Sequence, residues 1–170
     1  MIMRINPKTI LEKLIVKAAA NQPDITPEQL QQNGIDLRLA RAEKVVGQLE
    51  LYADNRTVKP SLIEMQLSNN CYLFHAGEQY SLTFMEDLDI PSGMAALIIH
   101  RSTINRFAGT LISAHIDSGY RSQGGCGATF RPHTTTLIEV GARVAQIVID
   151  TAEESSLYSG QYQDSKEKKQ

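Results

Sequence analysis

The stretch Gly34-Ile35-Asp36-Leu37-Arg38-Leu39 decides the fold, because apolar residues begin to alternate with polar ones here. Alternation is the pattern of an extended strand, in which every second side chain lies on the same face. Ile35, Leu37 and Leu39 therefore share one face of a predicted strand. From this point onward we expect the chain to be built from β structure.

Further short apolar or alternating runs follow, and turn-forming residues separate them. The clearest turn signals are Asp54-Asn55, Ala76-Gly77, Pro91-Ser92-Gly93 and Pro132-His133. Many short strands with close turns favour a mainly β fold of the barrel or jelly-roll kind. The predicted runs are residues 44–52, 72–74, 80–84, 95–100, 110–114, 128–131, 135–140 and 142–150.

Upstream of the strands, residues 1–33 are expected to form a helical segment. Asn6 can cap a helix and Pro7 suits its first position, which predicts a helix over residues 7–20. Thr26-Pro27-Glu28 predicts a second, short helical turn. The apolar residues that recur at helical spacing in the first helix are Ile10, Leu11, Leu14, Ile15 and Ala18.

Length and composition restrict the number of domains and the classes of partner that the chain can have. The 170 residues suit one domain, residues 1–170, and 17 basic against 19 acidic residues give a net charge of −2. That balance leaves no basic field to bind a nucleic-acid polymer. We expect no membrane span and no signal peptide, because the apolar stretches are short and interrupted. Cys71 and Cys126 lack any CxxC pairing, which favours reduced thiols in a cytoplasmic protein.

Residues 100–106 form the first candidate site, because they combine arginines with hydroxyls directly after an apolar strand. Arg101 and Arg106, with Ser102 and Thr103, are suited to phosphate oxygens. An exposed turn with solvated charges explains these residues equally well. The segment is therefore a candidate phosphate site with this alternative left open.

A second candidate is the apolar strand at residues 113–121 that runs into an acid, a glycine and an aromatic ring. Asp117 could act as a general base, and Tyr120 could form a flat platform for a sugar or base. Taken alone, an Asp-Ser-Gly turn in which Asp117 bonds its own backbone is the simpler interpretation. His115 is expected to be a packed or exposed strand residue.

Two further segments have weaker signals. Residues 121–127 are rich in glycine, which permits a bulge or a close ligand approach, but no Lys-Ser/Thr pair makes them a phosphate loop. Residues 141–147 are interpreted by default as a core strand with a solvated Arg143.

The His-x-Glu and Pro-Cys-x-x-Cys elements of zinc-dependent deaminases are missing from the sequence.

In order, these segments resemble the motifs of the trimeric dUTPase and dCTP deaminase superfamily, over about residues 34 to 163. The matching stretches are Gly34 to Leu39, Pro91 with Arg101-Ser102-Thr103 and Arg106, Ile116 to Arg121, and Gly141 to Gln146. The resemblance implies a distorted jelly roll with an N-terminal helix, assembled as a homotrimer whose subunits share each active site.

The resemblance also implies site roles. Arg101, Ser102, Thr103, Arg106 and Gln146 would bind the triphosphate together with magnesium, which no protein side chain would ligate directly. Tyr120 would stack on the deoxyribose, the strand residues Ser113, Ala114, His115 and Ile116 would read the base, and Asp36 is the acid of the first motif. Residues 157–170, with Tyr158 and Tyr162, would close over the nucleotide; simple disorder of this lysine-rich end is the alternative.

Departures from the motifs bear on the reaction. Residues 118–130 contain no glutamate, whereas the deaminase branch uses one there, and Gln123-Gly124-Gly125 resemble an insertion. We therefore expect a dUTP diphosphatase in which Asp117 activates the attacking water. A zinc-independent dCTP deaminase, with or without dUTP hydrolysis and using Glu139 or Asp117 at the ring, is one alternative. A trimer that binds nucleotide without turnover is another.

Overall fold

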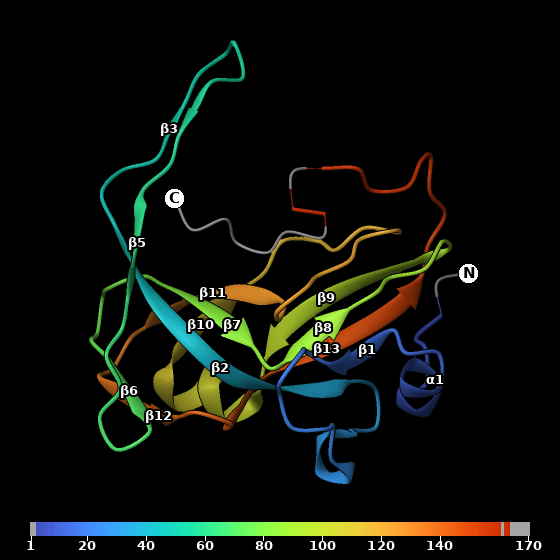
Figure 1. The fold of residues 1–170 in the computed structure, drawn as a ribbon, viewed down its shortest axis with the longest axis horizontal. Coiled ribbons are helices and arrows are strands. Elements are labelled where there is room, and N and C mark those ends of the chain that lie inside the picture. The colour runs from blue at the N-terminus through green and yellow to red at the C-terminus, as the bar shows by residue number, and fades with distance from the viewer. Residues whose placement is uncertain (1–2, 161, 164–170) are drawn as a thin grey trace.

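The computed structural model describes residues 3–160 and 162–163, which form a mainly β fold with one short N-terminal helix (Figure 1). The predicted fold class is confirmed in these features. No helix among the described residues is long and apolar enough to cross a membrane. In chain order the strands are β1 (Val16–Ala18), β2 (Ile35–Val46), β3 (Glu50–Leu51), β4 (Thr57–Val58), β5 (Ser61–Glu64), β6 (Cys71–Phe74), β7 (Tyr80–Phe84), β8 (Glu86–Leu88), β9 (Met94–His100), β10 (Gly109–Ile112), β11 (Gly127–Pro132), β12 (Thr136–Glu139) and β13 (Arg143–Thr151).

The main sheet is antiparallel, in the order β10-β11-β7-β2-β13-β9, and β5 pairs with the outer half of β2. Its two end strands approach each other. The chain after β10 pairs with β9 through two backbone hydrogen bonds between Ala96 and Ile116, of 2.9 and 3.0 Å. The sheet is thus a nearly closed barrel, and the seam that closes it runs through the segment bearing Asp117.

Aromatic side chains of β6, β7 and β11 pack together in the core. The Phe74 ring meets Tyr80 edge-on at 4.9 Å and Phe130 at 5.3 Å between ring centroids. Ile35, Leu37 and Leu39 of β2 are fully buried, as their alternation predicts. Edge-to-face packing of this kind suits the charge distribution of aromatic rings.

Asp36 and Arg38, the polar residues in the first half of β2, are buried as well, contrary to a simple alternating strand. The Arg38 guanidinium binds the buried Glu86 carboxylate, with Nε 2.7 Å from Oε1, and Gln29 Nε2 donates to the same oxygen at 2.8 Å. Burying charge requires such pairing and hydrogen bonding. The network attaches the short 3₁₀ helix η1 (Pro27–Gln29) to the barrel.

The helix predicted over residues 7–20 is wrong beyond its first turns. The observed α1 (Pro7–Glu12) is capped by Asn6 Oδ1, which accepts from the Lys8 backbone N–H at 2.9 Å. Leu14 has a left-handed φ of 55°, which ends the helix. Val16–Ala18 then pairs with β8, whose edge supplies backbone partners that outweigh the helical spacing of the apolar residues.

The strand predicted over residues 44–52 is also wrong in its extent. β2 ends at Val46, and Gly47 turns the chain outward with φ +102°. Residues 47–60, which we call the arm, project from the barrel as a hairpin with β3 and β4 near its tip (Figure 1). The remaining predicted runs correspond to β6, β7, β9, β10, β11, β12 and β13, with ends that differ by at most two residues.

Candidate active site

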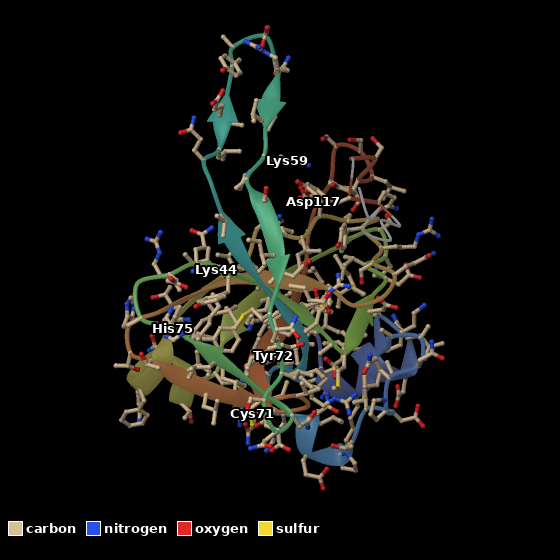
Figure 2. The ribbon with its side chains drawn as sticks, turned by 60° about the vertical axis from the view of Figure 1, so that its left-hand side comes forward. Lys44, Lys59, Cys71, Tyr72, His75 and Asp117 are labelled. Atoms are coloured by element: carbon tan, nitrogen blue, oxygen red, sulfur yellow. The ribbon has the colours of Figure 1, made fainter. Side chains whose placement is uncertain are left out.

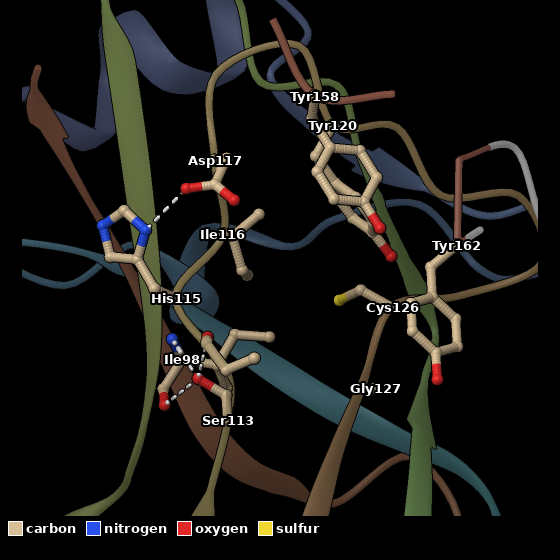
Figure 3. Close-up of a pocket in the computed structure, with 11 residues that line it drawn as sticks. Ile98, Ser113, His115, Ile116, Asp117, Tyr120, Cys126, Gly127, Tyr158 and Tyr162 are labelled. Atoms are coloured by element: carbon tan, nitrogen blue, oxygen red, sulfur yellow. Dashed lines mark hydrogen bonds and ion pairs between the residues drawn. The ribbon is translucent and has the colours of Figure 1, made fainter. Parts of the chain in front are cut away.

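A pocket of about 260 Å³ opens at the seam of the barrel (Figure 3). The segment 113–117 forms one wall, Tyr120, Tyr158 and Tyr162 form another, and Ile98, Cys126 and Gly127 complete it. Burial raises the pKa of the Cys126 thiol well above its ordinary value, and Glu86 and Asp87 add to this effect. The thiol is therefore uncharged, and the wall that it forms is weakly polar.

The wall at residues 113–117 is attached firmly to β9. Ser113 Oγ accepts from the Ile98 N–H at 3.2 Å and lies 3.1 Å from the Ile98 carbonyl oxygen, to which it can donate. The backbone pairing of Ala96 with Ile116 holds the other end of the wall. Four predicted base-reading residues, Ser113, Ala114, His115 and Ile116, thus line the pocket together.

Asp117 lies at the end of this wall with its carboxylate accessible. Its side chain is 59% exposed, and Oδ1 lies 3.0 Å from His115 Nδ1. The turn that follows is held by Gly119, whose N–H donates to the Ile90 carbonyl at 2.8 Å. Gly119 has φ +85°, and a Cβ there would lie 3.0 Å from Leu157, so this turn requires glycine.

Tyr120 faces the pocket and packs against Tyr158. The two rings meet at 71° with centroids 5.6 Å apart. Burial raises the pKa of Tyr120 to about 12, so its hydroxyl stays protonated at neutral pH. The pocket thus offers flat apolar faces on which a sugar or base can stack, next to an exposed carboxylate.

The closing segment, which we define as residues 157–160 and 162–163, lies across the turn at Asp117. The Tyr158 N–H donates to the Ser118 carbonyl at 2.8 Å. Gln163 binds the backbone twice, because its Nε2 donates to the Gly119 carbonyl at 2.8 Å and its Oε1 accepts from the Arg121 N–H at 3.1 Å. Residues 161 and 164–170 of the predicted lid lie outside the described residues.

The glycine-rich residues 121–127 pack on their own barrel. The buried Asp87 carboxylate accepts from Gly125 N–H at 2.8 Å, from Ser122 Oγ at 3.1 Å and from Gly124 N–H at 3.4 Å. A Cβ at Gly125 would lie 2.1 Å from the Phe84 carbonyl oxygen. The close approach predicted from these glycines is therefore to the protein backbone of β7, and Asp87 is an anchor that the sequence pattern did not indicate.

A second polar cluster surrounds the buried Asp36. Its carboxylate lies 3.0 Å from Arg101 Nε and 3.4 Å from Arg143 Nη1, and its Oδ1 accepts from Gln146 Nε2 at 3.3 Å. Burial raises the pKa of Asp36, and this effect outweighs the opposing effects of Arg101, Gln146 and Arg143. Arg143 is an ion-pair partner in this cluster, so the expectation of a merely solvated Arg143 is wrong.

The predicted phosphate-binding residues are not in the pocket. Arg101 and Gln146 belong to the Asp36 cluster, whereas Ser102, Thr103 and Arg106 lie exposed on the helical turn that includes η2 (Ile104–Ala108). None of the described residues of this group lines the pocket that contains Asp117. Within the described residues, the two groups of predicted site residues are thus not brought together in one pocket.

Within the described residues, no cluster of three or more His, Cys, Asp and Glu side chains is arranged to hold a metal ion. Asp36 has its carboxylate paired with arginines, and Asp117 is the one acid among the described residues that line this pocket. Oxygen-loving cations such as Mg²⁺ can instead be held through substrate phosphates and waters.

The sequence of this chain matches a known protein family. The model for dCTP deaminase-like domains matches residues 5–152. A probable deoxyuridine 5′-triphosphate nucleotidohydrolase of Methanothermobacter thermautotrophicus is 31% identical over 141 residues, which cover 81% of this chain and 89% of that protein. A dCTP deaminase of Pyrobaculum islandicum is 26% identical, over 90% of this chain and 88% of that protein.

Among solved structures, the 2′-deoxycytidine 5′-triphosphate deaminase from Agrobacterium tumefaciens has the same fold, with a TM-score of 0.61 and 20% identity. The match covers 85% of this chain and 46% of the Agrobacterium chain. The fold predicted from the ordered motifs is thereby confirmed.

Proposed function

The chain belongs to the dCTP deaminase-like family, and on this premise we propose that it is a dUTP diphosphatase, which converts dUTP and water to dUMP and pyrophosphate. One observation carries the choice of reaction. Among the described residues, Asp117 is the one carboxylate that lines the pocket, and no glutamate does. Hydrolysis needs a base for water, whereas deamination also needs an acid-base group at the cytosine ring.

Asp117 would accept a proton from a water molecule as the water attacks the α-phosphorus. Its exposure keeps the carboxylate reachable, and His115 Nδ1 at 3.0 Å restricts its orientation. Tyr120 would support the deoxyribose, and the backbone of residues 113–116 would read the base. The leaving pyrophosphate would carry the charge that develops in the reaction, so cations are required at the phosphate end of the site.

The phosphate end would come from a neighbouring subunit. Arg101, Ser102, Thr103, Arg106 and Gln146 stand apart from the Asp117 pocket, so a homotrimer with shared sites would bring both halves together. Magnesium bound to the triphosphate would neutralise phosphate charge and orient the chain of phosphates. We also propose a cytoplasmic location, since Cys71 and Cys126 are free thiols.

The test is a product analysis with purified protein and magnesium. dUTP and dCTP are incubated separately, and the nucleotides are resolved by ion-exchange chromatography. We expect dUMP and pyrophosphate from dUTP, with dCTP unchanged. Asp117→Asn keeps the size of the side chain but removes the base, and should lower kcat by at least about 100-fold; pyrophosphate release at the original rate would remove Asp117 from this role.

dCTP deamination is a second candidate, because one of the similar proteins is a dCTP deaminase. Glu139, the alternative acid for that reaction, lies on β12 and binds Asn70, with Nδ2 at 3.4 Å from Oε1. Glu139 does not line the described pocket. Formation of dUTP or dUMP from dCTP would support deamination, whereas tight binding of either nucleotide without any product would support a binding-only trimer.

A further inference from the structure

Lys59, on the arm, lies beside the closing segment. Its Nζ is 5.3 Å from the centroid of the Tyr162 ring. Figure 2 shows Lys59 at the base of the projecting hairpin, between β4 and β5. An ammonium within about 6 Å of an aromatic face is attracted by the ring. This contact joins segments that are far apart in sequence, at residues 59 and 162.

The backbone of Lys59 lies close to the paired strands of the barrel. The last β2–β5 pair is Val46 with Ser61, so Lys59 precedes the paired strand by only two residues. Pro60 restricts the backbone of Lys59 to extended conformations. A Cβ on Gly47 would lie 3.9 Å from the Pro60 Cα, which indicates that the two legs of the arm are in close approach here.

Tyr162 is part of the pocket wall, opposite Asp117 and next to Cys126 (Figure 3). Its neighbour Gln163 is bound to the backbone of Gly119 and Arg121. The two hydrogen bonds of Gln163 therefore fix where the closing segment crosses the turn, but they do not contact the Tyr162 ring. Lys59 contacts the aromatic ring itself, from the side of the arm.

We propose that Lys59 is a positioning residue that holds the Tyr162 ring over the pocket and thereby couples the arm to closure of the closing segment. This inference rests on the proposed function only for its kinetic consequence. The geometry assigns to the arm a role in substrate retention, because the cation favours the closed position of the ring and a neutral side chain at position 59 removes that contribution.

The kinetic test compares Lys59→Gln with Lys59→Arg. Arginine keeps a cation over the ring, whereas glutamine removes it. We expect Lys59→Gln to raise KM for the nucleotide about two- to fivefold with kcat nearly unchanged, and Lys59→Arg to retain the original KM. Lys17→Gln, on the edge strand β1 where Lys17 is exposed, controls for the loss of one positive charge.

A fluorescence test needs no turnover. The chain contains no tryptophan, so Tyr162→Trp introduces a single reporter ring at the proposed contact. Adding Lys59→Gln to this variant should shift the emission of the introduced indole to longer wavelength and increase its quenching by acrylamide, because the ring spends more time in water. Adding Lys17→Gln should change neither property.

The two measurements separate the possible failures. If no nucleotide is hydrolysed by any variant, the proposed reaction fails while the emission shift still supports the contact between Lys59 and the ring at position 162. An unchanged emission with Lys59→Gln overturns the inference. This holds even if Lys59→Gln raises KM, because a raised KM with unchanged emission would mean that the lysine acts on the nucleotide directly and not through the ring.

Discussion

At the scale of single residues, Asp87 stabilises the glycine-rich loop. Its carboxylate accepts from Ser122, Gly124 and Gly125, and the side chain is buried. Asp87→Ala would leave these donors without an acceptor, which should lower the free energy of unfolding by about 3 kcal/mol. Urea denaturation would measure this change; Asp89→Ala, at an exposed position two residues away, is the control and should cost less than about 0.5 kcal/mol.

Tyr120 gives a prediction for alkaline pH. Its folded pKa of about 12 lies above the ordinary value of 10.0, so the folded protein holds this proton more tightly than the unfolded chain does. The resulting stability is complete below pH 10 and is lost as the pH rises toward 12. Absorbance of tyrosinate at about 295 nm, compared between the protein and Tyr120→Phe, should show one tyrosine fewer titrating in the highest range; a difference already present near pH 10 would contradict this.

Site residues that could be predicted from the sequence lie in one continuous segment, whereas the partners that were missed come from distant parts of the chain. Asp117 and Tyr120 stand in one continuous segment, so their proximity follows from the chain itself. Asp87 meets its loop across 35 or more residues, and Arg143 meets Asp36 across 107. Such partners are set by strand pairing, which alternation alone does not specify.

At the scale of elements, the arm can be separated from the barrel. Residues 47–60 connect Val46 to Ser61, the last pair of β2 with β5, and two-residue Asn-Gly turns suit such hairpins. Replacing the arm by Asn-Gly should change the free energy of unfolding by less than about 1 kcal/mol, because Leu49 and Leu51 on the arm are 57% and 71% exposed.

The same replacement should raise KM, since it removes Lys59. Thermal unfolding and nucleotide kinetics on one preparation would check both expectations. A large loss of stability would show instead that the arm supports the fold. A retained KM would contradict the role of the arm in closure.

The elements themselves were predictable where the pattern was strong. Seven strands coincide with predicted runs because their apolar residues alternate or cluster between clear turns. β1 and β8 were missed since each is only three residues long and exists through pairing with the other. Leu14 ended the predicted helix through its backbone conformation, which spacing of side chains does not reveal.

At the scale of the whole molecule, the separation of Asp117 from Arg101 predicts complementation between subunits. Asp117→Asn and Arg101→Ala should each be inactive alone. Refolded together in equal amounts, they should recover roughly a quarter of the original activity, because in a cyclic trimer some sites would combine two intact halves. Activity that stays at the level of the single variants would place the whole site within one subunit.

The seam of the barrel determines which part of the sheet opens first when the protein is heated. Ile116, one residue before Asp117, is held to β9 by two backbone hydrogen bonds with Ala96, whereas β13 pairs with β9 along seven residues. The seam should therefore open before the rest of the sheet, as locally weak pairings do. Amide protons at the seam would exchange with solvent faster than those of β13, and on warming the enzyme would lose its activity while most of its strands were still folded.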